Sequence, residues 1–126
     1  MVPKMIQVYG RGHLRNNPLE LQRALEILQA VLYKEPYPHE WSLKYGEIAE
    51  AGQRIDAIIE LWYEDGTMKK IGVEVESHKE GVDKAIDRLR WLKAIGSLSV
   101  GYVYVRSLEE VQKSISVRSK RLIVVR

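Results

Sequence analysis

Three acidic residues near the middle of the chain have the types and spacing that metal-dependent chemistry requires. Asp56 lies in the run RIDAIIELWY, and Glu74 and Glu76 lie in the run MKKIGVEVE. Hard divalent ions such as Mg²⁺ prefer oxygen ligands, and carboxylates supply them. Whether these carboxylates can share an ion depends on how the two runs pair with each other.

The two runs are expected to form a β-hairpin, with strands at 54–63 and 68–76. A three-residue loop, with Gly66 in the left-handed region, places Asp56 opposite Glu74. A two-residue turn would instead place Asp56 opposite Val75 and would mix charged and aliphatic side chains on both faces. We therefore favour the three-residue loop, because it places the aliphatic side chains on one face of the hairpin and the charged side chains on the other.

In that register one face of the hairpin is entirely apolar, and it comprises Ile55, Ala57, Ile59, Leu61, Ile71, Val73 and Val75. The other face carries Arg54, Asp56, Ile58, Glu60, Lys70, Gly72, Glu74 and Glu76. The register predicts that Glu60 faces Lys70 and that Arg54 faces Glu76. Each such pair of opposite charges contributes ~0.2–1 kcal/mol.

The functional consequence concerns Asp56 and Glu74. Directly opposed Cβ atoms lie ~4.5–5.5 Å apart, so the two carboxylates repel each other unless a cation or a proton lies between them. Mg²⁺ or Mn²⁺ held by this pair is one interpretation. The alternative is a solvated strand face on which Arg54 neutralises part of the charge.

The rest of the chain predicts alternating helices and strands. The helix at 18–34 follows an expected N-cap at Asn17, and the helix at 78–95 follows a capping box at Ser77. Residues 39–53 are less distinct, with a short strand in WSLKY and a turn or helical turn in EIAEAG. The remaining expected elements are a β-prone piece at 5–9, strands at 100–105 and 122–125 and a short helix at 107–115.

This order predicts an α/β fold with a central mixed β-sheet flanked by helices. The 126 residues, 45% of them hydrophobic and 29% charged, suit one globular domain. We divide it into a basic arm at 1–16, a core at 17–105 and a C-terminal helix and strand at 106–126. Without cysteine the chain has no disulfides or thiolate metal sites. No apolar run is long enough for a membrane span and no export signal is evident, so we expect a cytoplasmic, intracellular protein without a membrane partner.

Around these acids the sequence resembles the PD-(D/E)xK nuclease superfamily, which includes restriction endonucleases and archaeal Holliday junction resolvases. The resemblance covers residues 17–105, with RIDAII at the Asp position and GVEVE at the Glu-x-Lys position. It implies a single-domain restriction-endonuclease-like fold with an αβββαβ core. Two residues depart from the motif: Ile55 stands where the family often has Pro, and Glu76 stands where it has Lys.

The resemblance also implies roles for individual residues. Asp56 and Glu74 would hold Mg²⁺ (or Mn²⁺), and Glu76 would take the position that orients or deprotonates the attacking water. Glu20 is the candidate for a further acidic metal ligand on the first helix; its alternative role is to complement the helix dipole. Because the family lysine sometimes lies on the following helix, Lys79 or Lys84 would be its replacement. His78 is either a metal ligand or a simple helix-start residue.

The basic residues predict contacts with a nucleic-acid backbone, although the net charge of +3 is too small to require such a partner. The candidates nearest the acids are Arg54, Lys79, Lys84 and Arg88. Others lie at the two ends of the chain: Arg11, His13, Arg15, Lys113, Arg118, Lys120 and Arg121.

Three hypotheses follow from these observations. The first is a Mg²⁺-dependent endo- or exonuclease acting on DNA, with RNA as the other possible substrate. The second is a catalytically inactive nucleic-acid-binding or regulatory module on the same fold. The third is an interaction protein whose acidic face pairs with a partner subunit. The resemblance allows a homodimer, and the sequence leaves the oligomeric state open.

Overall fold

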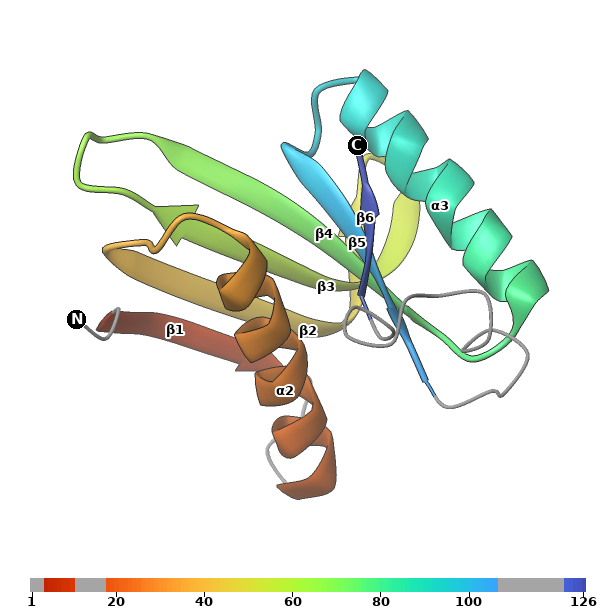
Figure 1. Cartoon of the computed structure of the whole chain (residues 1–126), viewed down its shortest axis with the longest axis horizontal. Coiled ribbons are helices and arrows are strands. Elements are labelled where there is room, and N and C mark those ends of the chain that lie inside the picture. The colour runs from red at the N-terminus through yellow and green to blue at the C-terminus, as the bar shows by residue number, and fades with distance from the viewer. Residues whose placement is uncertain (1–3, 11–17, 107–121) are drawn as a thin grey trace.

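The computed structural model describes residues 4–10, 18–106 and 122–126, and for residues 4–10 and 18–21 it describes only the backbone. Within these ranges the chain forms two helices and one sheet (Figure 1). In chain order the elements are β1 (Lys4–Gly10), α2 (Pro18–Lys34), β2 (Glu40–Glu50), β3 (Gln53–Trp62), β4 (Met68–Glu76), α3 (Lys79–Ala94), β5 (Val100–Val105) and β6 (Leu122–Val125). Of the basic arm expected at 1–16, residues 4–10 form β1, and its basic part with Arg11, His13 and Arg15 lies outside the described residues. The expected helix at 107–115 lies outside them as well.

The six strands form one mixed sheet in the order β1-β2-β3-β4-β5-β6. β3 runs antiparallel to both β2 and β4, and β6 runs antiparallel to β5. β1 and β2 are parallel, as are β4 and β5, which are connected through α3. Figure 1 shows α2 and α3 on opposite sides of this sheet. The expected α/β class, with a mixed sheet between helices, is therefore confirmed for the described part of the chain.

The β3–β4 hairpin has the register predicted from its three-residue loop. Glu60 faces Lys70 and Ala57 faces Val73. Gly66 adopts φ 85°, the left-handed conformation that glycine tolerates best. The Gly66 N–H donates to the Tyr63 carbonyl at 3.0 Å, which closes the loop.

The other strand of the central meander, β2, is longer than the sequence indicates. It continues to Glu50, through most of the segment at 47–52 for which the sequence predicts a turn or helical turn. The strand contains a bulge, where Gly46 and Glu47 have φ values of 101° and 48° and the pairing with β3 shifts between Tyr45 and Ile48. A bulge bends its strand and increases the local twist. Beyond this bulge the β2–β3 hairpin packs toward α3.

This bend corrects the predicted division of residues between faces. Ile55 packs in the core on the α3 side, whereas Ala57 and Ile59 pack on the α2 side. Ile58 and Gly72, expected on the charged face, are also buried beneath α3. The predicted pairing of Arg54 with Glu76 is also wrong: Arg54 faces Ala49 of β2, because the β3–β4 ladder ends at Ala57 and Val73.

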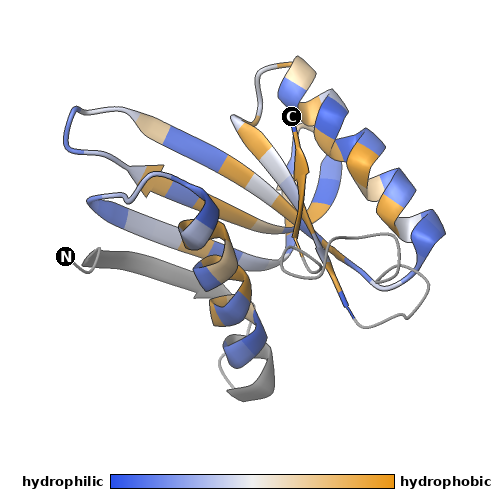
Figure 2. Ribbon diagram, viewed as in Figure 1, coloured by the Kyte–Doolittle hydropathy of each residue, from blue (hydrophilic) through white to orange (hydrophobic). Residues whose placement is uncertain are grey.

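Two apolar clusters fill the spaces between the sheet and its helices. On the α2 side they include Ala24, Ile27, Leu28 and Val31, and on the α3 side Val82, Ala85, Leu89 and Leu92. Figure 2 shows apolar and polar residues interspersed along both helices, as expected for helices covered on one face. On the α3 side Ile86 is partly buried and Ile95, just after the helix, is half exposed.

The sequence predicts the C-terminal end of α3 well, but it does not predict how the N-terminal end is capped. The helix ends at Ala94, next to the expected end at 95, and Gly96 beyond it adopts φ 80°. The N-cap is His78 rather than Ser77, and no side-chain hydrogen bond caps the helix. The capping box predicted from Ser77 and Glu80 is therefore wrong.

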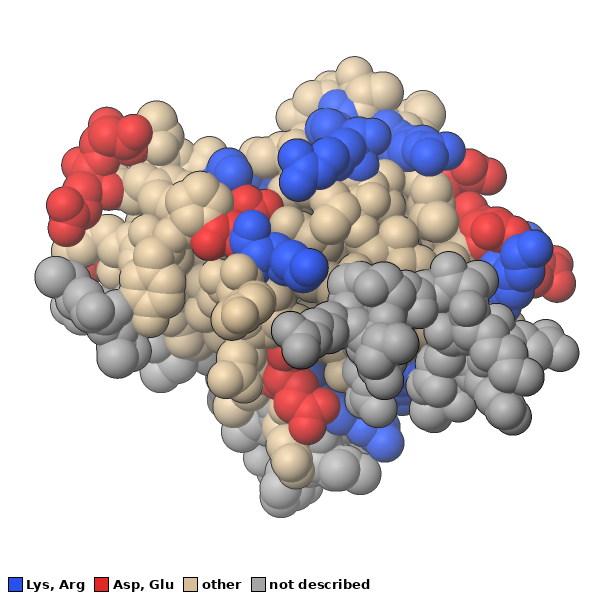
Figure 3. Space-filling view, in the orientation of Figure 1, with Lys and Arg blue, Asp and Glu red and all other residues tan. Residues whose placement is uncertain are grey.

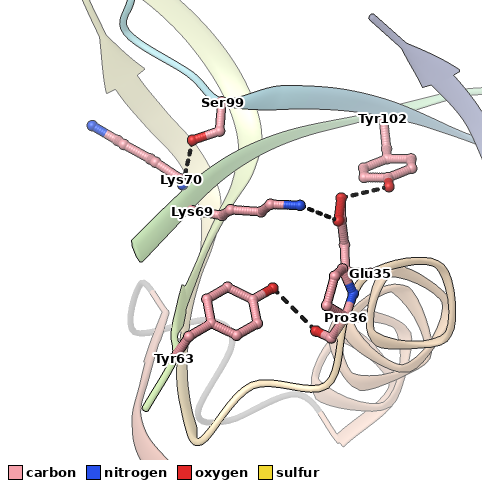
Figure 4. Close-up of polar contacts among 7 residues, drawn as sticks. All are labelled: Glu35, Pro36, Tyr63, Lys69, Lys70, Ser99 and Tyr102. Atoms are coloured by element: carbon pink, nitrogen blue, oxygen red, sulfur yellow. Dashed lines mark hydrogen bonds and ion pairs between the residues drawn. The ribbon is translucent and has the colours of Figure 1, made fainter. Parts of the chain in front are cut away.

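A polar cluster fixes the end of α2 to the sheet (Figure 4). Glu35 accepts hydrogen bonds from Lys69 of β4 at 2.9 Å and from Tyr102 of β5 at 2.8 Å. Tyr63 donates to the Pro36 carbonyl at 3.0 Å. Neither of the helices in the described ranges is long and apolar enough to cross a membrane.

Candidate active site

Asp56 lies where β3 and β4 stop pairing with each other. The last ladder pair is Ala57 with Val73, and two residues further along β4 the Val75 N–H donates to Asp56 Oδ2 at 2.7 Å. A carboxylate oxygen thus takes the place of the backbone carbonyl that a continued ladder would supply. β4 remains paired with β5 as far as Glu76, so the opening lies between β3 and β4 alone.

Glu74 is the most buried of the three acids, with 3% of the residue exposed. Arg88 of α3 donates from a terminal guanidinium nitrogen to Glu74 Oε2 at 2.5 Å. Burial raises the pKa of Glu74 to about 7, and the negative charges of Asp56 and Glu76 act in the same direction. Arg88 opposes that rise, but it does not overcome the loss of hydration.

Asp56 and Glu76 belong to the same electrostatic cluster. Burial raises the pKa of Asp56, while the hydrogen bond from Val75 and the charge of Arg88 oppose the rise. Burial also raises the pKa of Glu76, and the Asp56 charge adds to that effect. The three carboxyl groups therefore repel one another, and among the described residues Arg88 is the cation whose charge acts on all three.

Glu76 lies against the first turns of α3. A Cβ atom placed on Gly81 would overlap the Glu76 carboxylate, so the absence of a side chain at Gly81 makes room for this acid. The Glu76 carbonyl accepts the Arg106 N–H at 2.7 Å, which keeps the end of β4 attached to the chain after β5. The backbone of Glu76 is thus fixed at the end of β4, and its carboxylate lies over Gly81, close enough to Asp56 and Glu74 for their charges to interact.

Two residues near the acids were missed by the sequence reasoning. The charge of Glu47 raises the pKa of Asp56, and the charge of Arg106 lowers it. Gly46 within a strand pattern is a signal for a bulge, and a bulge changes how the following residue, Glu47, is placed relative to β3. No comparable signal marks Arg106, whose position depends on how β5 pairs with β4.

Of the basic residues predicted to contact nucleic acid, some are exposed and others already pair with acidic side chains. Arg54 is largely exposed and lies 4.0 Å from Glu47, and Lys79 is exposed. Lys84 pairs with Glu80 at 3.1 Å on the outer surface of α3. Arg88, one turn further along α3, instead reaches Glu74. The side chain of Glu20 lies outside the described residues.

The donor set suits a hard divalent cation through two carboxylates. Mg²⁺ commonly binds to one or two carboxylates together with water and substrate phosphates, and Asp56 and Glu74 provide such a pair. The hydrogen bond from Val75 uses Oδ2 and the ion pair with Arg88 uses Oε2, so each carboxyl group has a second oxygen to offer. No group of three or more His, Asp or Glu side chains suited to a metal ion occurs in the described part of the chain.

Comparisons with known proteins add no family assignment. A scan against protein-family models gives no match, and searches of curated proteins and of solved structures give none. The functional argument therefore depends on the site itself.

Proposed function

We propose that this protein is a Mg²⁺- or Mn²⁺-dependent nuclease that hydrolyses DNA phosphodiester bonds on a restriction-endonuclease-like fold. The observation that carries the proposal is the placement of the Asp56 carboxylate at the opening between β3 and β4, beside Glu74. The element order from α2 to β5 agrees with the αβββαβ core of the PD-(D/E)xK superfamily.

In this mechanism Asp56 and Glu74 hold the metal ion. When bound, the divalent ion supplies Lewis-acid polarisation of a phosphate oxygen and lowers the pKa of water. Glu76 accepts a proton from the attacking water, a role that the raised pKa of its carboxyl group favours. The N–H of Val75 orients Asp56 from behind by fixing Oδ2.

The basic surface supports an anionic polymer as the substrate. Lys79 and Lys84 lie on the exposed side of α3, which begins three residues after Glu76. In the view of Figure 3, further Lys and Arg side chains gather around the C-terminal half of α3. These positive charges would contact backbone phosphates and make binding depend on salt concentration.

Cleavage of single-stranded, duplex and branched DNA tests the proposal. We expect the wild type to cleave at least one of them in Mg²⁺ or Mn²⁺ and to stop in EDTA. Asp56→Asn retains an oxygen for the Val75 N–H but loses the carboxylate charge, and we expect at least about 100-fold less activity, because even outer-shell partners of metal ligands contribute about 10–100-fold. Asp83→Asn makes the same change at an exposed position on α3 and serves as the control.

A second candidate function is favoured by the ion pair between Arg88 and Glu74. A guanidinium that already neutralises the buried acid is compatible with a catalytically inactive module that only binds nucleic acid. That function predicts salt-sensitive DNA binding without cleavage, and equal affinity for the wild type and Asp56→Asn. Equal inertness of both proteins in every metal would refute the enzymatic proposal.

A further inference from the structure

Arg88 has an unusual environment for a cation on an amphipathic helix. It follows Ala85 and precedes Leu89 and Leu92, all fully buried, and one third of its side chain is exposed. Its guanidinium reaches Glu74, whose side chain is 4% exposed. Leaving a buried carboxylate without a partner is strongly unfavourable, so an opposite charge must lie beside Glu74 whenever that group is ionised.

Two kinds of cation can satisfy that requirement, and both would bind to the Glu74 carboxyl group. The ion pair with Arg88 uses Glu74 Oε2. A divalent ion shared by Glu74 and Asp56 needs the same carboxylate and repels a neighbouring guanidinium. One guanidinium charge also leaves three carboxyl groups only partly compensated, which favours an ion of higher charge.

A guanidinium released from Glu74 would be well placed to bind phosphate. Arginine has five N–H donors in a planar arrangement that matches phosphate oxygens. Arg88 projects from α3 beside the carboxylates, so a phosphodiester bound near them would be within reach of its partly exposed side chain. One residue would thus neutralise the acid in the absence of metal and bind the anionic substrate in its presence.

We propose that Arg88 exchanges with a divalent cation at Glu74, and that the released guanidinium binds the phosphodiester. This inference rests on the proposed metal site at Asp56 and Glu74, and it identifies Arg88 as the residue that links metal binding to substrate binding. The coupling is reciprocal, so metal strengthens phosphate binding and phosphate strengthens metal binding to the same degree.

Calorimetric titration with Mn²⁺ alone tests the exchange. Arg88→Met removes the competing charge and retains a long, helix-favouring side chain, and we expect it to bind Mn²⁺ about tenfold more tightly than the wild type, a difference of about 1.4 kcal/mol. Arg90→Met, an exposed arginine on the same helix, is the matched control and should bind Mn²⁺ as the wild type does.

Binding of a phosphorothioate oligonucleotide, whose linkages resist hydrolysis, tests the second half of the proposal. Mn²⁺ should raise the affinity of the wild type and of Arg90→Met by about tenfold or more. Arg88→Met should lose that enhancement although its Mn²⁺ affinity is higher. A merely structural Arg88 would not move the two affinities in opposite directions.

A measurement on the unaltered protein keeps the proposal testable if Arg88→Met does not fold. Titration with Mg²⁺ should shift the side-chain N–H resonance of Arg88 in an ¹⁵N-correlated spectrum, with the same saturation curve as the Val75 amide. An Arg88 resonance that stays fixed while Val75 shifts would refute the exchange and leave the metal site intact. Absence of Mn²⁺ and Mg²⁺ binding in the wild type and in a folded Arg88→Met variant would refute the metal site itself.

Discussion

Glycine is a poor residue for the first turns of a helix, and Gly81 is explained by the acid that lies over it. Glycine within a helix is about 0.5–1 kcal/mol less favourable than alanine because of its backbone entropy. In α3 the missing side chain leaves room for the Glu76 carboxylate. The lower helix stability caused by Gly81 thus accompanies the placement of the Glu76 carboxylate.

This explanation predicts that Gly81 and Glu76 are energetically coupled. Gly81→Ala should stabilise the Glu76→Ala variant by about 0.5–1 kcal/mol, the usual helix effect. In the wild type the stabilisation from Gly81→Ala should be smaller by at least about 0.5 kcal/mol, because the new Cβ displaces the Glu76 carboxylate. Urea unfolding of the four proteins gives both values. Equal effects of Gly81→Ala in the two backgrounds would show that the carboxylate is not constrained by this glycine.

At the scale of elements, the bulge in β2 determines where the end of the β2–β3 hairpin packs. By redirecting the β2–β3 hairpin toward α3, it brings Glu50 beside Lys70 of β4 and Ser97 of the loop after α3. Lys70 Nζ and Ser97 Oγ donate to Glu50 Oε1 at 2.7 and 2.5 Å. The end of the hairpin is therefore attached to two other elements at a single carboxylate oxygen.

The attachment predicts a specific dependence of stability on pH. Burial alone would raise the pKa of Glu50, but the hydrogen bonds from Lys70 and Ser97, together with the Lys70 charge, outweigh burial and lower the pKa below its ordinary value. Because the pKa is lower in the folded protein, the unfolded state binds more protons near this pH. The contribution of Glu50 to the free energy of unfolding is therefore complete above the ordinary pKa of 4.5, and it is lost as the pH falls through the folded-state pKa.

We expect Glu50→Gln to reduce the free energy of unfolding by about 1–3 kcal/mol at pH 7, the range for hydrogen bonds to charged groups. The difference from the wild type should shrink between pH 5 and pH 3. Urea unfolding at several pH values measures it, with Glu64→Gln in the exposed hairpin loop as the control. Parallel pH profiles for the wild type and Glu50→Gln would contradict this account.

Elements that are determined by residues close together in the sequence could be predicted, whereas those determined by tertiary packing could not. The loop at Glu64, Asp65 and Gly66 has local turn chemistry, so the register that places Asp56 near Glu74 could be predicted. The path of β2 could not, because Glu47 and Ala51 adopt positive φ values that only tertiary packing selects. The ion pair of Arg88 with Glu74 joins residues on different elements, and helical spacing alone could not distinguish it from an outward-facing arginine.

Across the whole molecule, both cores depend on the same sheet. Gly72 of β4 and Gly101 of β5 are paired neighbours, and Leu89 of α3 packs directly over them, so that a Cβ on Gly101 would lie 2.9 Å from Leu89 Cβ. On the other side, β5 contributes Tyr102 and Tyr104 to the core beneath α2. A disturbance of the sheet from either side must therefore affect both layers.

We consequently expect the two layers to unfold together. Trp41 is buried in the core on the α2 side and Trp91 lies half exposed on α3, so single-tryptophan variants report on each layer separately. Their urea midpoints should coincide. Leu92→Ala should lower both midpoints equally, with a loss of about 2–5 kcal/mol in the free energy of unfolding. Midpoints that separate in Leu92→Ala would show that the layers unfold independently.

The hydrogen bond from Val75 to Asp56 has a consequence for how this protein's evolution should be interpreted. Asp56 closes the seam between β3 and β4, so natural selection for folding alone would preserve it in a lineage that had abandoned catalysis. An invariant aspartate among homologous sequences would then be poor evidence of activity. Correlated replacement of Glu74 and Arg88 is the substitution pattern that would identify lineages in which the chemistry has changed.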